Sequence, residues 1–266
     1  MKITFIGGGN MGEAIIAALL RKKVVTPDEI NVSDVDPSRL DYLYERYGIS
    51  TSTNNRTSIK EAEVVVLAVK PQILTAVLDE LKGHLTPSQL VLSIIAGAGI
   101  SKLRNGLNHR KIVRSMPNTP SQISEGMTVW TASPEVTKGQ KGSARSILKV
   151  MGQEIEVDDE KYINMATAVS GSGPAYIFYF IESLIKAAEK LGFNCETAEK
   201  LAKQTVIGSV HLMQKSDKTP GELRRAVTSP GGTTAAALVT LDKDDFQGLI
   251  ERAIKAAYDR AKELGS

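Results

Sequence analysis

The start of the chain constrains the fold more than any other stretch, because an apolar run, three spaced glycines and a helical pattern follow one another there. Residues 3–6 are mostly apolar and are all branched or aromatic, which is typical of a short buried strand. Residues 13–20 are mostly apolar and predict a helix. Gly7, Gly9 and Gly12 lie between them with the spacing G-x-G-x-x-G. In a strand–turn–helix context this spacing predicts a turn that binds a dinucleotide.

Each glycine of this motif has its own physical reason. Gly7 allows a sharp turn, Gly9 lets backbone N–H groups approach a pyrophosphate, and Gly12 lets the helix pack close to the strand. The first turn of the helix adds unpaired N–H groups and the positive end of the helix dipole. The residues expected to contact the cofactor here are Ile6, Gly7, Gly8, Gly9, Asn10, Met11 and Gly12.

Strands and helices alternate through the first part of the chain. Apolar runs predict further strands at 30–33, 49–51, 64–69, 90–95, 111–115, 127–132 and 154–157, with helices at 38–47 and 71–82. This alternation predicts an α/β fold with a parallel, doubly wound sheet of the Rossmann type. Ligands of such sheets bind at the carboxyl ends of the strands. We therefore expect the residues after each strand to contact one shared cofactor.

The end of the second strand carries conflicting signals about which dinucleotide binds. A carboxylate at this point bonds the ribose 2′-hydroxyl of NADH, and Asp34 fits that role. Ser33, Arg39 and the turn at 54–56 could instead serve the 2′-phosphate of NADPH. Asp34 and Asp36 could also simply cap the following helix. The cofactor is NADPH or NADH, and the sequence leaves this choice open.

From about residue 158 the pattern becomes entirely helical. Helices are expected at 160–170, 174–191, 195–214, 219–227, 232–241 and 244–264. This predicts a Rossmann domain over 1–159 and an all-helical dimerisation and substrate domain over 160–266. The helices are apolar enough to leave surface for a second copy of the chain. The uncharged stretch 162–181 is interrupted by serines, glycines and a proline, so two buried helical segments are expected rather than a membrane span.

Two polar, glycine-rich turns in the helical half predict a substrate site. In the second of them, two glycines lead into a helix whose first turn carries two hydroxyl groups, a suitable site for a small anion such as a carboxylate. Helix capping would explain one hydroxyl residue, but not this combination. The expected substrate contacts are Ser172 in the first turn and Ser229, Gly231, Gly232, Thr233 and Thr234 in the second.

Composition argues against several other classes of protein. The net charge is +3 for 266 residues, and basic and acidic residues are interleaved, so no nucleic-acid partner is expected. One cysteine and three scattered histidines provide no metal-ligand cluster. The single cysteine and the lack of a secretory signal favour a cytoplasmic protein.

At this point the sequence is seen to resemble the pyrroline-5-carboxylate reductases over nearly its whole length. The matching motifs are 5–12, 68–71, 116–120, 170–176 and the spaced pattern from Pro220 to Asp242. The resemblance implies reduction of 1-pyrroline-5-carboxylate to L-proline with NAD(P)H, the final step of proline biosynthesis. It also implies a Rossmann domain followed by a helical dimerisation domain, with dimers often assembled into a ring.

The resemblance also implies residue roles. The cofactor contacts that it adds or repeats are Ser33, Asn55, Ala68, Val69, Lys70, Pro71, Ile94, Ala96 and Gly97. The substrate carboxylate would lie on the turn at 229–234, which a partner subunit can contribute, with the catalytic Thr234 near the ring nitrogen. Two departures are Asp34, which disfavours the NADPH that members often prefer, and Ala226, where some members have Asn.

Hydride transfer to an imine needs few catalytic groups, since the cofactor supplies the reactivity. A Thr hydroxyl or a water molecule can hold or deliver the proton. The alternative is another imine or β-hydroxyacid oxidoreductase of the same two-domain build. The β-hydroxyacid enzymes use a Lys of the helical domain, and Lys186 and Lys190 lie here on a charged face with Glu182 and Glu189. A cofactor-binding protein without enzymatic activity is disfavoured by the second anion site.

Overall fold

The computed structural model describes residues 1–265, which form two compact units. The first comprises residues 1–172 together with 257–265, and the second comprises Gly173–Ala256.

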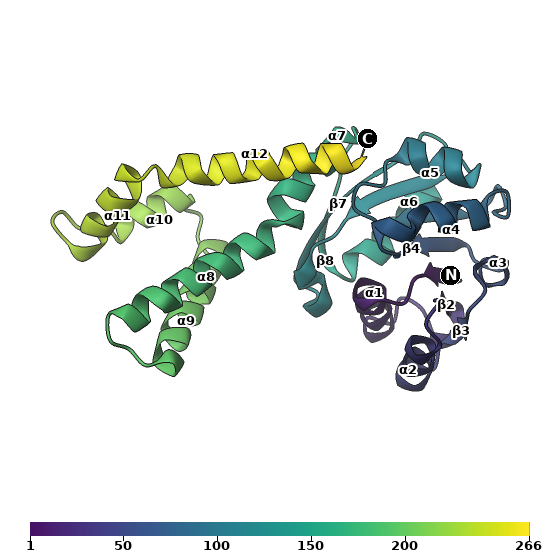
Figure 1. The fold of residues 1–266 in the computed structure, drawn as a ribbon, viewed down its shortest axis with the longest axis horizontal. Helices are drawn as coiled ribbons and strands as arrows, with labels where there is room; N and C mark the ends of the chain where they lie inside the picture. The colour runs from purple at the N-terminus through teal and green to yellow at the C-terminus, as the bar shows by residue number, and fades with distance from the viewer. Residues whose placement is uncertain (266) are drawn as a thin grey trace. The chain divides into compact units, whose positions relative to one another are not determined.

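The first unit is built on one eight-stranded sheet with the order β3-β2-β1-β4-β5-β6-β7-β8 (Figure 1). The strands are β1 (Ile3–Ile6), β2 (Ile30–Ser33), β3 (Ser50–Ser52), β4 (Val64–Leu67), β5 (Leu90–Ser93), β6 (Ile112–Met116), β7 (Gly126–Ala132) and β8 (Gly152–Glu156). The chain winds outward in both directions from β1 and β4, which confirms the predicted doubly wound, Rossmann-type sheet.

The sheet is not entirely parallel, contrary to the sequence-based expectation. β7 runs antiparallel to β6, whereas the other neighbouring pairs are parallel. The reason is the connection between them, which contains only a short 3₁₀ helix, η3 (Thr119–Ile123). A parallel neighbour needs a crossover of a dozen or more residues, and this connection is shorter.

Helices connect most of the strands. They are α1 (Asn10–Arg21), α2 (Pro37–Tyr47), α3 (Asn55–Ser58), α4 (Leu74–Leu81), α5 (Ile100–Leu107) and α6 (Lys138–Lys149), with 3₁₀ turns η1 (Pro27–Glu29) and η2 (Pro71–Ile73). α2 shows both expected end signals. Asp36 accepts a hydrogen bond from the backbone N–H of Ser38 (3.0 Å), and Gly48 ends the helix in the left-handed conformation. Two predicted strands are shorter than expected, since β4 ends at Leu67 and β5 at Ser93.

Two apolar clusters cover the two faces of the sheet. Because successive side chains of a strand point to opposite faces, Phe5 belongs to one cluster and Ile6 to the other. The first cluster contains the fully buried Trp130, whose ring N–H donates to Glu154 Oε2 (2.6 Å). The second lies under α4 and α5 and includes Leu78. The sheet is therefore a packed core that holds the strand ends in place.

Buried His109 gives a pH-dependent contribution to stability. The residue is 6% exposed, and its Nε2 atom lies 2.9 Å from the Gln89 carbonyl oxygen. Burial lowers its pKa, outweighing the hydrogen bond to that carbonyl. The unfolded chain therefore binds a proton near pH 6.5 that the folded chain does not, so stability is full above this pH and falls below it. His109→Gln should flatten this decline, by at most about 1.4 kcal/mol per pH unit.

The measurement is the urea midpoint between pH 5 and 8 at one protein concentration. His84 is exposed and serves as the control. The urea midpoint of His84→Gln should change with pH as steeply as that of the wild-type protein. Equal slopes for wild type and His109→Gln would contradict the assignment.

The chain then becomes helical, as predicted. α7 (Lys161–Ala166) continues as a π-helical turn, η4 (Thr167–Gly171), still within the first unit. The second unit begins with α8 (Gly173–Lys190), α9 (Cys195–Gln214), α10 (Pro220–Ala226) and α11 (Thr233–Lys243), and includes the first part of α12 (Phe246–Gly265). α8 and α9 lie side by side (Figure 1). The domain boundary expected between 159 and 160 stays a prediction, although α7 packs on β6 and β7.

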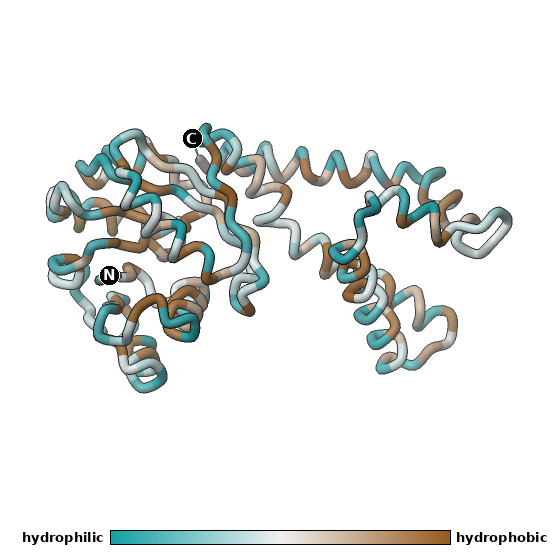
Figure 2. Tube along the Cα trace, turned by 180° about the vertical axis from the view of Figure 1, so that it is seen from behind, coloured by the Kyte–Doolittle hydropathy of each residue, from teal (hydrophilic) through white to brown (hydrophobic). Residues whose placement is uncertain are grey.

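The prediction that both helical segments within 162–181 are buried is wrong for α8 in this single chain, whereas α7 and η4 bury Ile163 and Ala168. α8 has no buried residue, and Phe178 and Tyr179 are 63% and 70% exposed. Apolar residues recur along the helices of this unit (Figure 2), yet only Ala198 and Ala202 of its residues are buried. Hydrophobic residues of this size are usually covered, so this unit has apolar surface available for another chain. Among the described residues, no helix has the length and apolar character needed to cross a membrane.

Candidate active site

Four strand ends meet in one row at the carboxyl edge of the sheet. Ile6 pairs with Ser33 on one side and with Leu67 on the other, and Leu67 pairs with Ser93. The pairing continues past the strands, because Gly7 N–H donates to the Ser33 carbonyl (2.8 Å). The backbone N–H groups of residues 68 and 94 donate in the same way to residues 6 (2.9 Å) and 67 (3.2 Å). Segments predicted to contact one cofactor thus lie next to one another.

The glycine turn has the geometry that its spacing predicted. Gly7 has a φ of +103°, and a Cβ added there would lie 2.7 Å from the Ala68 carbonyl oxygen. A Cβ on Gly12 would lie 2.7 Å from the Gly7 carbonyl oxygen. A Cβ on Gly9 would have no described atom within 4 Å. Gly9 is also the N-cap of α1 and no side chain caps that helix, so the turn is open where a phosphate would approach.

Gly8, an unspecified position of the motif, is constrained as well. A Cβ there would lie 2.8 Å from Leu43 Cδ1 and 3.2 Å from Val32 Cγ1. Its peptide groups are also held from both sides. The Gly8 N–H donates to Asp34 Oδ2 (2.7 Å), and Arg39 Nε donates to the Gly8 carbonyl oxygen (2.6 Å). Asp34 and Arg39 therefore both contact the glycine turn.

The capping alternative for the two aspartates is resolved by these contacts. Asp36 caps α2, whereas Asp34 accepts from the N–H groups of Gly8 and Asp36, the latter at 3.1 Å. Asp34 thus ties the end of β2 to the glycine turn. Beside it, the hydroxyl of Ser33 is buried and has no hydrogen-bond partner among the described residues.

Sequence reasoning missed a cluster between α1 and α2 that is centred on Glu13. The Glu13 carboxylate forms an ion pair with Arg39 and accepts hydrogen bonds from the hydroxyls of Tyr42 (3.0 Å) and Tyr47 (2.8 Å). Partial burial raises the pKa of Glu13, but hydrogen bonds from Arg39 and the two tyrosines outweigh it and lower the pKa. Burial and the bond to Glu13 raise the pKa of Tyr47 to about 12. Glu13 is therefore a stable anion beside the glycine turn.

The other expected cofactor residues have mixed surroundings. Lys70 is exposed and precedes Pro71, the first residue of η2, directly after Ala68 and Val69. Ile94 and Ala96 follow β5 and are half-buried. Asn55 begins α3, and its side-chain N–H donates to Glu80 Oε2 (2.7 Å). Its amide is thus already hydrogen-bonded on one side.

The chain also returns to this edge at its far end. Gly97 has a φ of +74°, and a Cβ added there would lie 2.7 Å from the carbonyl oxygen of Leu264. The last turn of α12 therefore packs against the loop that follows β5, and this position requires glycine.

Ser172 lies just beyond the π-helical turn, and its N–H donates to the Thr167 carbonyl oxygen (2.8 Å). Asn118 connects this segment to the sheet. Its side-chain N–H donates to the Ser170 carbonyl (3.0 Å), and its side-chain oxygen accepts from the Met127 N–H (2.9 Å). Sequence reasoning gave Asn118 no role, although the M-P-N-T-P motif around it was the available signal.

The predicted substrate turn belongs to the second unit. Gly231 has a φ of +71°, and the Gly232 N–H donates to the Ser229 carbonyl oxygen (3.1 Å). Gly232 is the N-cap of α11 and no side chain caps this helix. Thr233 and Thr234 form its first turn, with Thr233 exposed and Thr234 half-buried. This turn therefore combines an uncapped helix start with two hydroxyl residues, and its role as an anion site stays a prediction.

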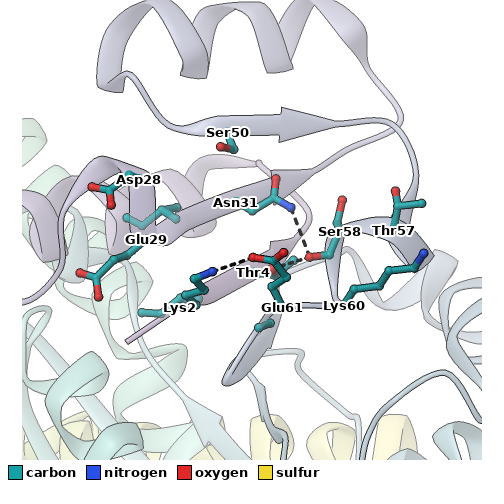
Figure 3. Close-up of a pocket in the computed structure, with 13 residues that line it drawn as sticks. Lys2, Thr4, Asp28, Glu29, Asn31, Ser50, Thr57, Ser58, Lys60 and Glu61 are labelled. Carbon is teal, nitrogen blue, oxygen red and sulfur yellow. Dashed lines mark hydrogen bonds and ion pairs between the residues drawn. The ribbon is translucent and has the colours of Figure 1, made fainter.

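A cavity of about 270 Å³ lies at the opposite, amino edge of the sheet (Figure 3). Its polar groups bond to one another, as where Thr4 and Asn31 both donate to the Ser58 carbonyl oxygen (2.8 and 3.2 Å). Lys2 and Glu61 form an exposed ion pair at its mouth (2.6 Å). None of the site residues predicted from the sequence lines it.

The residues at the carboxyl edge fit a dinucleotide. In Rossmann folds the phosphates lie at the start of the first helix and the ribose lies at the end of the second strand. Here a Cβ on Gly9 would meet open space, and the buried Ser33 hydroxyl at the end of β2 has no partner among the described residues.

Comparisons with known proteins agree. The family model "Pyrroline-5-carboxylate reductase dimerisation" matches residues 160–264, and "NADP oxidoreductase coenzyme F420-dependent" matches residues 2–97. The pyrroline-5-carboxylate reductase of Synechocystis is 40% identical, over 100% of this chain and 98% of its own. That of Pseudomonas aeruginosa is 39% identical, over 99% and 96%.

Solved structures show the same similarity. A pyrroline-5-carboxylate reductase from Coxiella burnetii has a TM-score of 0.92 and 42% identity, covering 100% of this chain and 98% of that one. The Plasmodium falciparum pyrroline carboxylate reductase with NADP bound has a TM-score of 0.90 and 33% identity, with the same coverage. The chain therefore belongs to the pyrroline-5-carboxylate reductases, the NAD(P)H-dependent oxidoreductases of the final step of proline biosynthesis.

Proposed function

We propose that the carboxyl edge of the sheet binds NAD(P)H and that the turn before α11 binds the substrate carboxylate. The observation that supports the first part is the open space beside Gly9 in a row of aligned strand ends. The proposed cofactor contacts are those derived above: Ile6 to Gly12, Ser33, Asp34, Arg39, Asn55, Ala68 to Pro71, Ile94, Ala96 and Gly97. When bound, the reduced nicotinamide supplies a hydride to the carbon of the substrate C=N bond.

The substrate anion is proposed to lie on the turn formed by Ser229, Gly231, Gly232, Thr233 and Thr234, with Ser172 as a further contact. The uncapped start of α11 and the hydroxyls of its first turn support this, because both stabilise a carboxylate without needing an arginine. The Thr234 hydroxyl oxygen accepts a hydrogen bond from the N–H of the protonated imine and so orients the C=N bond. A protonated imine is already a good electrophile, so a strong acid is not needed.

The competing β-hydroxyacid chemistry finds no suitable acid/base group in Lys186. Lys186 pairs with Glu182 (2.6 Å) on the exposed face of α8, and hydrogen bonding to this carboxylate raises its pKa further. A lysine that stays charged in this way is a poor acid/base catalyst near neutral pH.

The family's dimerisation model covers the helical half, and the exposed apolar side chains of α8 support self-association. We further propose that the dimers assemble into a ring and that the protein acts in the cytoplasm, without nucleic-acid or membrane partners.

Thr234→Ala tests the substrate site. We expect kcat/KM for pyrroline-5-carboxylate to fall by about 10- to 1,000-fold, in the range of one lost catalytic hydrogen bond. The assay follows NAD(P)H oxidation, with Thr240→Ala as the matched control, because Thr240 is exposed further along α11. An unchanged kcat/KM in Thr234→Ala would remove this residue from the mechanism. A 3-hydroxy acid oxidised at a similar rate by the wild-type protein would instead favour the alternative chemistry.

A further inference from the structure

Arg39 stands at the position where a dinucleotide with a 2′-phosphate differs from one without it. In Rossmann folds the adenosine ribose lies at the carboxyl end of the second strand, and a nearby arginine accommodates a 2′-phosphate. Asp34 and the buried Ser33 hydroxyl mark that end here, and Asp34 and Arg39 contact the same glycine of the turn. Arg39 keeps 22% of its side chain exposed, so an incoming phosphate can contact it.

Arg39 is not a free cation, however. Its Nη2 atom forms an ion pair with Glu13, and its guanidinium carbon lies 4.9 Å from the centre of the Tyr42 ring. Tyr42 and Tyr47 also donate to Glu13, so this carboxylate is fixed by donors from α2. Because these bonds lower the pKa of Glu13, it remains ionised at neutral pH. A 2′-phosphate therefore meets an arginine whose charge is already balanced.

We propose that Glu13 determines how strongly the protein discriminates between NADPH and NADH, by competing with the 2′-phosphate for Arg39. This inference rests on the proposed binding of NAD(P)H at the glycine turn. Glu13 acts as a positioning residue, since it holds Arg39 and contacts the Gly8 peptide only through it. The 2′-phosphate of NADPH has to share Arg39 with Glu13, whereas NADH has no 2′-phosphate that would pair with Arg39.

The test replaces Glu13 with Gln, which keeps an oxygen that the two tyrosines can bond. Dissociation constants for NADPH and NADH are measured by fluorescence titration of the protein without substrate. We expect the Kd for NADPH to fall about tenfold, because the substitution removes a negative charge beside a partly exposed phosphate. The Kd for NADH should change less than about twofold. Adenosine 2′,5′-bisphosphate and AMP serve as smaller probes of the same difference.

Asp41→Asn is the matched control for net charge. Asp41 is exposed on α2, two residues from Arg39 and hence on the opposite face of the helix. This variant should leave the ratio of the two dissociation constants unchanged. The gain from Glu13→Gln should be largely lost in an Arg39→Met background, because the competition requires Arg39.

Three outcomes would overturn the proposal. One is an unchanged NADPH-to-NADH ratio in Glu13→Gln. The second is a full gain in the Arg39→Met background, which would mean that Glu13 repels the phosphate without acting through Arg39. The third is that Arg39→Met alone weakens the binding of adenosine 2′,5′-bisphosphate no more than it weakens the binding of AMP. By contrast, a wild-type protein that binds neither dinucleotide would refute the proposed cofactor site itself.

Discussion

Replacing Gly9 with valine is expected to weaken the binding of NADH and NADPH by at least about a thousandfold, while leaving the protein folded and its unfolding temperature only slightly lower. The backbone of Gly9 has φ −65° and ψ −175°, a conformation that any residue adopts. A Cβ there would have no described atom within 4 Å, so the variant should fold. The same space is the approach to the N–H groups of α1, so the valine methyl groups should displace the pyrophosphate.

The measurement pairs a fluorescence titration of each cofactor with a thermal unfolding curve. Gly142→Val is the matched control, because Gly142 is an exposed helical glycine whose Cβ would also meet open space. It should bind both cofactors normally and unfold no earlier, since valine has a higher helix propensity than glycine. Gly12→Val should lose both stability and binding, because its Cβ would lie 2.7 Å from the Gly7 carbonyl oxygen. Normal cofactor binding by Gly9→Val would place the pyrophosphate elsewhere.

The sequence predicted the parts of the site that depend on local chain geometry. The spacing of Gly7, Gly9 and Gly12 required a tight turn after a strand, and the structure places each glycine as that geometry needs. The strand ends could be aligned because parallel strands of a doubly wound sheet finish at one edge. The sequence pattern was enough to predict the turn and the strand ends, because each of them is determined by residues close together in the chain.

Contacts between distant residues could not be predicted in this way. Glu13 and Arg39 lie on different helices, and only the packing of α1 against α2 brings them together. Gly8 likewise occupies an unspecified position of the motif, and it is the packing of Val32 and Leu43 beside it that leaves no room for a side chain. These residues have no local signal, because their partners are chosen by the tertiary fold.

The fold shows the same division. α5 and α6 went unpredicted because each is rich in polar residues and contains glycine, which weakens a helical pattern. The direction of β7 depends on the length of its connection to β6, which strand patterns do not report. The apolar pattern of α8 correctly indicated a helix, yet burial did not follow within one chain. A pattern says that a face must be covered, but not by which chain.

Replacing Arg114 with methionine is expected to destabilise the first unit strongly, although Arg114 belongs to neither of its apolar clusters. Arg114 lies on β6 with its side chain 5% exposed, and donates to Glu160 (2.7 Å) and Asn164 (2.9 Å). Glu160 also accepts the N–H of Ile100, the first residue of α5 (2.7 Å). One ion pair therefore joins β6 to the beginnings of α5 and α7, and none of this was predicted from the sequence.

Breaking a buried ion pair lowers the free energy of unfolding by about 3–5 kcal/mol, because the remaining charge stays buried without a partner. Glu160 is 35% exposed and can be partly rehydrated, so we expect a loss of about 2–4 kcal/mol in the free energy of unfolding. Urea unfolding at one protein concentration measures it. Lys2→Met removes an equally short pair, Lys2–Glu61 (2.6 Å), whose side chains are 55% and 79% exposed, and should lower the free energy of unfolding far less, because water screens an exposed pair. Equal losses in the two variants would show that burial of Arg114 adds nothing, and that the junction of β6, α5 and α7 is held by apolar packing instead.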